Sequence, residues 1–237
     1  MAVKTYSYSK QGFVDCSAHT RVREMASKRG GKLYSDTVLI DETLMAMIEK
    51  LFAKLRCSKY IISSGYRTAQ HDKVVGGNGA GQHTKGKAVD ACFYDKNGKI
   101  ISAKIVCCVA QDLGFKGIAN ISSKYQYVHL DMRDRGIYRG DEIKGTNSVT
   151  SDFYKYFKVS KADVAKYTGE TVKVNYFAKY TGNSLSIVTA LNSLGQASNF
   201  AYRSKIAKAN GISGYIGTAG QNSKMLSLLK KGKLIKP

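Results

Sequence analysis

The feature that most constrains this chain is a glycine-rich segment, residues 63–93, with the sequence SSGYRTAQHDKVVGGNGAGQHTKGKAVDACF. Its glycines at 76, 77, 79 and 81 permit a tight, irregular loop. The loop leads to His83 and then to AVDACFY, residues 88–94, whose composition predicts a strand that carries Asp90. The fold must therefore join an imidazole-bearing loop to a carboxylate-bearing strand within a few residues.

A second strand is predicted over YQYVHLDM, residues 125–132. Because side chains alternate along a strand, one face is expected to carry Tyr125, Tyr127, His129 and Asp131. If the two predicted strands pair antiparallel, His83, Asp90 and His129 converge on one ion. Two imidazole nitrogens and one carboxylate oxygen suit zinc and leave a fourth position open, as in catalytic sites. Such an ion activates water and polarises a carbonyl, which amide hydrolysis at neutral pH requires.

One competing motif overlaps this segment, because residues 81–87, GQHTKGK, satisfy the GxxxxGK pattern of a phosphate-binding loop. The next residue is Ala88, whereas that loop needs Ser or Thr there to hold Mg²⁺. The loop must also lead into a helix, and the sequence after it predicts a strand. Nucleotide binding is therefore disfavoured.

The surrounding sequence predicts an α+β domain. Residues 41–56, DETLMAMIEKLFAKLR, place apolar side chains at helical spacing behind Asp41, a suitable N-cap. A short strand is predicted over 59–64, and a helix over 103–115 that stops at Gly114. We expect a small mixed or antiparallel sheet with helices, carrying the zinc site.

The charge of the chain is strongly positive: 38 Lys and Arg against 17 Asp and Glu give a formal net charge of +21. This predicts attraction to a polyanion, such as nucleic acid, anionic lipid or an anionic wall polymer. Nucleic acid is not the expected partner, since only the charge favours it and no recognised binding motif is present. A membrane is not expected either, because no apolar run reaches the roughly 18 residues of a span and the N-terminus lacks a secretory signal.

The charge is also unevenly distributed, since no carboxylate side chain follows Glu170. The shift predicts two domains, with the zinc site in residues 1–157 and a basic domain in residues 158–237. Three helical stretches are predicted in the second domain, over Ser186–Leu194, Phe200–Asn210 and Gln221–Leu229. We expect this domain to be small and mainly helical.

The run SGYRTAQHDKVVGGNGAGQHTKGKAVD, followed by YVHLDMR, resembles the D-Ala-D-Ala carboxypeptidase branch of the zinc metallopeptidases that also include lysostaphin-type enzymes and hedgehog-like domains. SGYR, the double-glycine loop, HxxGxAxD and the later VHxD occur in the family's order, and the similarity covers roughly residues 10–135. The resemblance implies a zinc metallopeptidase that cleaves peptide bonds in peptidoglycan stems. Whether it is of the D-Ala-D-Ala carboxypeptidase or the L-Ala-D-Glu endopeptidase type stays open.

By position, the resemblance implies that His83, Asp90 and His129 are zinc ligands and that Arg67 steadies a substrate carboxylate or the developing oxyanion. A planar guanidinium suits this role because it binds oxyanions bidentately and stays charged. The chain departs from the family's SxH pattern, because it has Gly81 and Gln82 before the first ligand. A hydroxyl contact to the substrate is therefore in doubt.

The general base is open as well, because the chain has Gln126 and Tyr127 where relatives have an acid or a histidine before the last ligand. Asp131 is expected either to accept a proton from water or to orient His129. Tyr127 is expected to donate to the tetrahedral intermediate, although a strand tyrosine more often only packs. We expect His71, in a loop, to line the substrate cleft together with Gln82.

The segment 183–237 is similar to the C-terminal wall-binding modules of bacteriophage endolysins that infect Gram-positive hosts. This implies synthesis in the host cytoplasm without a signal peptide and action on the wall after release. The expected partners are peptidoglycan and anionic wall polymers, which would tether the catalytic domain. The sequence thus predicts an endolysin-like peptidase that uses Zn²⁺. The alternatives are a catalytically inactive wall-binding protein that keeps the zinc fold and, favoured by the charge alone, a basic nucleic-acid-binding protein. Host and oligomeric state stay open.

Overall fold

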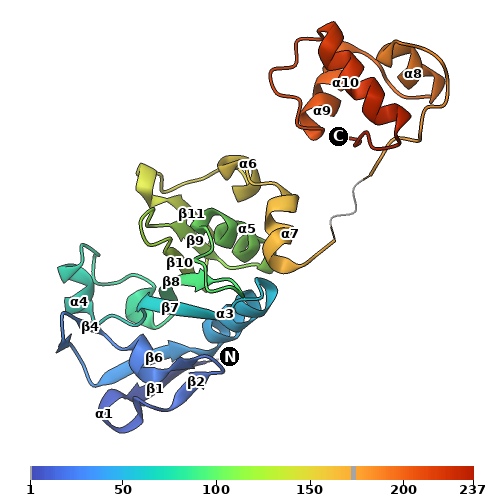
Figure 1. Cartoon of the computed structure of the whole chain (residues 1–237). Helices are drawn as coiled ribbons and strands as arrows, with labels where there is room; N and C mark the ends of the chain where they lie inside the picture. Colours follow the sequence, from blue (N-terminus) through green and yellow to red (C-terminus); the bar gives the residue numbers. More distant parts are fainter. Residues whose placement is uncertain (1, 172–174) are drawn as a thin grey trace. The chain divides into compact units, whose positions relative to one another are not determined.

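A five-stranded sheet lies at the centre of the N-terminal part of the chain, in the order β11-β9-β10-β8-β7. Its strands are β7 (Lys59–Ser64), β8 (Ala88–Tyr94), β9 (Gly117–Asn120), β10 (Val128–Asp131) and β11 (Tyr138–Asp141). Neighbouring strands are antiparallel except β9 and β11, which are parallel. The computed structural model, which describes residues 2–171 and 175–237, thereby confirms the predicted α+β class (Figure 1).

Two helices contribute many residues to the main hydrophobic core, α3 (Glu42–Lys54) and α5 (Ala103–Leu113). As predicted, Asp41 caps α3 by accepting a hydrogen bond from the backbone N–H of Leu44 at 2.8 Å. Gly114 ends α5 in the left-handed conformation, with φ 89°. The core takes alternate residues of the central strands, such as Val89 and Leu130, and so leaves the side chains between them to the other face of the sheet.

Short elements complete this unit. The sheet β1–β6 is antiparallel, and two further hairpin pairs are β2–β3 and β4–β5. These elements are β1 (Val3–Ser7), β2 (Asp15–Ser17), β3 (Thr20–Arg21), β4 (Lys28–Arg29), β5 (Lys32–Leu33), β6 (Thr37–Asp41), α1 (Tyr8–Gln11), α2 (Val22–Met25), α4 (Ala69–Val74), the 3₁₀ turns η1 (His83–Lys85) and η2 (Glu142–Lys144), α6 (Phe153–Phe157) and α7 (Lys161–Thr168).

The strand expected over 125–132 is shorter than predicted, since β10 begins only at Val128. Gln126 adopts a left-handed conformation with φ 54°, which breaks the extended chain. Its side-chain Oε1 accepts a hydrogen bond from the backbone N–H of Ala103 at 2.9 Å, at the start of α5. Gln126, at a position considered for the general base, therefore accepts one of the backbone N–H groups that the N-terminus of a helix leaves without a partner.

The boundary between the two parts of the chain also differs from the expected one. The structure divides into the units Met1–Thr171 and Val172–Pro237, so residues 158–171 belong to the first unit rather than the second. The reason is packing: α7 contacts α5, and Val164 is buried in the main core. Lys161 also donates to Asp112 of α5 at 2.8 Å. The charge shift near Glu170 marks this boundary better than the polar stretch before it.

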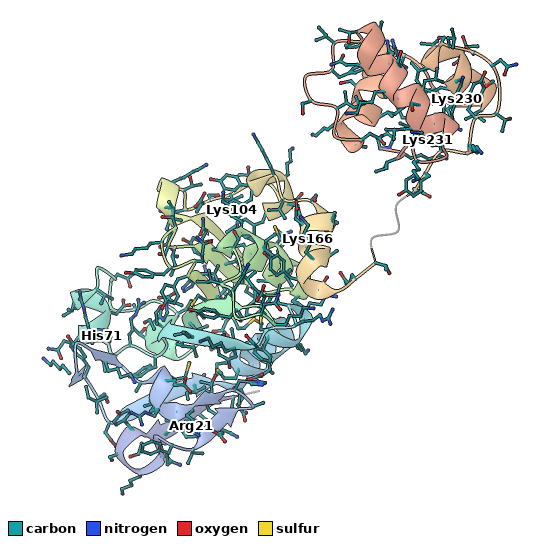
Figure 2. All side chains as sticks on the ribbon, viewed as in Figure 1. Arg21, His71, Lys104, Lys166, Lys230 and Lys231 are labelled. Carbon is teal, nitrogen blue, oxygen red and sulfur yellow. The ribbon has the colours of Figure 1, made fainter. Side chains whose placement is uncertain are left out.

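The second unit has a core of its own. Three helices within residues 175–237 contribute to it, α8 (Ile187–Ser193), α9 (Phe200–Ala209) and α10 (Ala219–Lys230). Their bounds agree with the predicted stretches to within two residues at each end. Residues 175–237 contain nine Lys and Arg and no Asp or Glu; two of the lysines, at 230 and 231, are labelled in Figure 2. Across the described parts of both units, no helix has the length and apolar character needed to span a bilayer.

Candidate metal centre

The register of β8 and β10 decides how the site is assembled. These strands are antiparallel, and His129 lies directly opposite Asp90, so both side chains project from the same face. His83 is the first residue of η1, which ends at Gly86 with φ 69°. A Cβ at Gly86 would lie 2.5 Å from the carbonyl oxygen of Leu39, so only glycine fits where the chain turns from η1 toward β8. The strand after this turn also excludes the phosphate-binding loop, which needs a helix there.

Three atoms from these residues form a compact triangle, as the strand-pairing argument predicted. His83 Nε2 lies 3.2 Å from His129 Nδ1 and 3.3 Å from Asp90 Oδ1. His129 Nδ1 lies 3.0 Å from the same carboxylate oxygen. Ligands at the usual zinc distances of about 2.0–2.1 Å stand about 3.3 Å apart in a tetrahedron. The donor set and its spacing therefore fit a zinc ion.

The other nitrogen of each imidazole has a partner that selects the tautomer. His83 Nδ1 lies 2.7 Å from the carbonyl oxygen of Gly65, to which it donates. His129 Nε2 lies 3.1 Å from Asp131 Oδ2 and donates to that carboxylate. When both imidazoles are neutral, as metal binding requires, these bonds leave His83 Nε2 and His129 Nδ1 as the lone-pair atoms that face Asp90.

The charges of the site are strongly coupled. Burial alone would raise the pKa of Asp90, but the imidazoles of His83 and His129 hold it well below its usual range. Burial opposes the charged form of His129, yet hydrogen bonds to Asp131 and Asp90 raise its pKa to about 9. The metal-free chain therefore holds a proton on His129 at neutral pH, which a metal ion must displace.

The side chain of Asp131 has no exposed surface, and both of its carboxylate oxygens accept hydrogen bonds. Arg133 Nη2 donates to its Oδ2 at 2.5 Å, and Arg133 Nε donates to its Oδ1 at 2.9 Å. Burial would raise the pKa of this carboxyl, but Arg133 and His129 lower it far below the ordinary value. So acidic and enclosed a group is a poor general base. Of the two roles considered, the geometry favours the orientation of His129.

Arg67 lies against the metal centre, with all three guanidinium nitrogens engaged. Nη2 donates to Asp90 Oδ2 at 2.6 Å, opposite the oxygen that faces the imidazoles, and Nη1 donates to Asp72 Oδ1 at 3.3 Å. Nε donates to Ser64 Oγ at 2.7 Å. In this arrangement Arg67 fixes the ligand Asp90; its contact with substrate stays a prediction.

Asp72 explains the glycine-rich loop and was not identified from the sequence. It is buried, and its Oδ2 accepts from the backbone N–H of Gly79 at 2.9 Å. A Cβ at Gly77 would lie 2.2 Å from this carboxylate oxygen, so the loop closes over Asp72 only with glycine there. The run of glycines in the sequence indicates that the loop passes close to a buried group, which the structure identifies as the Asp72 carboxylate.

Of the two residues predicted to line the substrate cleft, His71 has different surroundings from those expected, and the role of Gln82 stays a prediction. His71, labelled in Figure 2, lies on α4 rather than in a loop and is only 5% exposed. Its ring stacks on that of Tyr34, with ring centroids 4.4 Å apart. Its Nδ1 is 2.9 Å from Ser27 Oγ, so the residue supports packing rather than lining an open cleft. Gln82 precedes His83, and among the described residues its buried Oε1 has no hydrogen-bond partner.

Two tyrosines lie near the sheet face that carries the site. Tyr127 precedes β10 instead of lying on it, and burial together with the Cys92 thiol raises its pKa. The tyrosine that contacts a candidate ligand is Tyr138 of β11, whose ring meets that of His129 edge-on, with centroids 6.2 Å apart. Sequence reasoning missed Tyr138 because β11 was not predicted.

Comparisons with known proteins agree with this geometry. Residues 11–131 match the family model described as peptidase M15, a range that includes all three candidate ligands and Asp131. The chain is also 32% identical over 150 residues to an L-alanyl-D-glutamate peptidase of Listeria phage A118. That alignment covers 63% of this chain and 44% of the relative, so it spans less than half of the relative's length.

Proposed function

The chain belongs to the peptidase M15 family, and we propose that it is a zinc-dependent endopeptidase that cleaves the stem peptides of bacterial peptidoglycan. The observation that carries this proposal is the triangle of His83, Asp90 and His129, whose sides of 3.0–3.3 Å match the edges of a zinc tetrahedron. Three protein ligands leave one position for water or substrate, which is the arrangement of catalytic rather than structural zinc.

The residues around the triangle have separate tasks. His83, Asp90 and His129 would hold the zinc ion, which would supply a Lewis acid to activate water and polarise the scissile carbonyl. Arg67 fixes Asp90 so that one carboxylate oxygen faces the imidazoles. Asp131, itself held by Arg133, fixes the tautomer of His129. These contacts preorganise the ligands, so little reorganisation accompanies metal binding.

The bond that we propose as the target is the one between L-alanine and D-glutamate. The relative from phage A118 carries the name L-alanyl-D-glutamate peptidase, and the alignment with it covers 63% of this chain. A D-Ala-D-Ala carboxypeptidase must recognise a C-terminal carboxylate. Arg67, the cation expected to do so, already uses three of its five N–H groups on Ser64, Asp72 and Asp90, and these two carboxylates offset its charge. That occupancy supports an endopeptidase.

We propose further that the second unit binds anionic polymers of the bacterial wall and that the chain acts there after release from the cell that makes it. The support is its charge: nine basic side chains and no acidic one in residues 175–237. A separate core allows this unit to act as a tether that raises the local concentration of the peptidase on the wall.

The test uses purified walls and three preparations of the full chain: zinc-loaded, chelator-treated and zinc-restored. We expect hydrolysis in the first and third, with new amino termini on D-glutamate identified by mass spectrometry. Asp90→Ala should abolish hydrolysis, whereas Asp134→Asn, which removes an exposed carboxylate paired with Lys87, serves as the matched control. Hydrolysis that persists in Asp90→Ala or under chelation would refute zinc dependence. Wall binding without any hydrolysis would support the inactive alternative.

A further inference from the structure

We propose that Tyr138 and Glu142 form a subsite that binds an ammonium group of the substrate, about two strand spacings from the metal centre. This inference rests on the proposed function, because it concerns how the same site selects its peptide. It is independent of the metal ligands, since neither residue belongs to them. The strand register, Gly140 and the Glu142 carboxylate, which forms no ion pair within the described residues, support it.

The register places four residues in a row across the sheet. Asp90 of β8 lies opposite His129 of β10, His129 lies opposite Ala119 of β9, and Ala119 lies opposite Gly140 of β11. Residues paired in this way project from one face. Because neighbouring strands are about 4.8 Å apart, Gly140 lies roughly 10 Å from His129 along the row.

The side chain of Tyr138 fills the space that this row leaves. A Cβ at Gly140 would lie 2.6 Å from Tyr138 Oη, so the phenol rests on the bare backbone of that glycine. The ring meets His129 edge-on, with centroids 6.2 Å apart and planes at 75°. Tyr138 therefore extends from the candidate ligand to the far end of the row and places its hydroxyl there.

The hydroxyl of Tyr138 is hydrogen-bonded to the carboxylate of Glu142, which has no cationic partner among the described residues. Tyr138 Oη donates to Glu142 Oε1 at 3.0 Å, and Glu142 is exposed at the start of η2. Within the described residues, no Lys, Arg or His nitrogen forms an ion pair with Glu142, although Asp72, Asp90 and Asp131 are all paired. In a chain with 38 basic and 17 acidic residues, a carboxylate left free beside the site is available to a cation from elsewhere.

Peptidoglycan stems carry a suitable cation. The third residue of the stem is a diamino acid, and one γ-linked glutamate separates it from the L-alanyl–D-glutamate bond. A residue of extended chain spans about 3.3–3.6 Å, and the γ-linkage and the diamino side chain lengthen this reach. An ammonium group at about 10 Å from the scissile bond therefore matches the position of Tyr138 Oη and Glu142.

The experiment compares two soluble peptides, N-acetyl-L-Ala-γ-D-Glu-L-Lys-D-Ala and the same peptide with the lysine side chain acetylated. We expect the zinc-loaded wild-type chain to cleave the free-amine peptide with a kcat/KM about tenfold higher, mostly through KM, as one charge-assisted contact predicts. Glu142→Gln should remove this preference, and Tyr138→Phe should reduce it. Glu170→Gln, which neutralises another exposed carboxylate of the same unit, should retain it.

Equal cleavage of the two peptides by the wild-type chain would overturn the subsite while leaving the proposed function intact. A preference that survives Glu142→Gln would overturn it as well. If the wild-type chain cleaves neither peptide, the proposed bond is wrong and the subsite fails with it. Zinc content and the thermal midpoint should be equal in wild type and Glu142→Gln, so that lost selectivity is not a consequence of unfolding or metal loss.

Discussion

Replacing Asp131 by Asn tests whether this residue positions His129 or acts as the general base. The change keeps the shape of the side chain but replaces one acceptor oxygen by a donor. His129 Nε2 needs an acceptor at 3.1 Å, and Arg133 donates to both carboxylate oxygens. An amide has one acceptor oxygen and one NH₂ donor, so either orientation sets the NH₂ against a donor. With the oxygen in place of Oδ2 the NH₂ faces the backbone N–H and Nε of Arg133, and with the oxygen in place of Oδ1 it faces His129 Nε2.

The magnitude follows from the tautomer. If the amide oxygen turns to Arg133, the amide NH₂ faces His129 Nε2 and favours the imidazole with its proton on Nδ1, the atom that faces Asp90. Once wild-type His129 is neutral, its proton stays on Nε2 and Nδ1 is free for the metal, whereas in this tautomer the proton stays on Nδ1 and must be exchanged before a metal binds. Loss of such an outer contact weakens metal binding about 10- to 100-fold, or about 1.4–2.7 kcal/mol. We therefore expect the zinc Kd of Asp131→Asn to rise by this factor.

The assay is zinc titration against a competing chelator, followed by kcat at saturating zinc. A positioning role predicts a weakened Kd and a kcat that largely recovers once zinc is saturating. A general base predicts the reverse, an unchanged Kd and a kcat that stays lost at any zinc concentration. A zinc Kd within twofold of wild type would refute the reasoning. Asp134→Asn, exposed and outside this network, is the control for a lost negative charge.

Three further predictions follow from pH, the loop and the domain boundary. The metal-free His129 has a pKa of about 9, raised above its usual 6.5, so zinc affinity should increase with pH and level off above about 9. The protonated form of His129 also stabilises the metal-free fold. This stabilisation is present below about pH 6.5 and is lost as the pH rises through about 9, which calorimetry of the metal-free chain checks. Gly77→Ala should lower the free energy of unfolding by about 1–3 kcal/mol in denaturant titrations because its Cβ meets a buried carboxylate, whereas Gly81→Ala, with open space around it, should have little effect. A fragment 1–171 should cleave a soluble stem peptide about as fast as the full chain, and a fragment 1–157, which lacks the buried part of α7, should have a lower thermal midpoint.

The sequence by itself determined much of the fold around the site. β7 and β8 have the predicted bounds, α3 begins after its predicted N-cap Asp41, and α5 ends at the predicted Gly114. These elements have local causes: apolar periodicity, an N-cap at Asp41 and a left-handed glycine at Gly114. The three candidate ligands were identified for a similar reason, because the glycine loop and the two strands are local patterns and antiparallel pairing is a simple way to bring them together.

The tertiary structure decided which groups surround those ligands. Gln126 breaks the predicted strand because the start of α5, more than twenty residues earlier in the chain, supplies a donor for its side chain. Arg67 is held by Asp72 and Asp90, and Tyr138 meets His129 only because β11 pairs with β9. Such contacts join residues from different elements, and no local pattern encodes them. The spacing of residues along the chain specified the ligands, whereas the pairing of distant strands and helices specified their protonation, their orientation and the surface that a substrate meets.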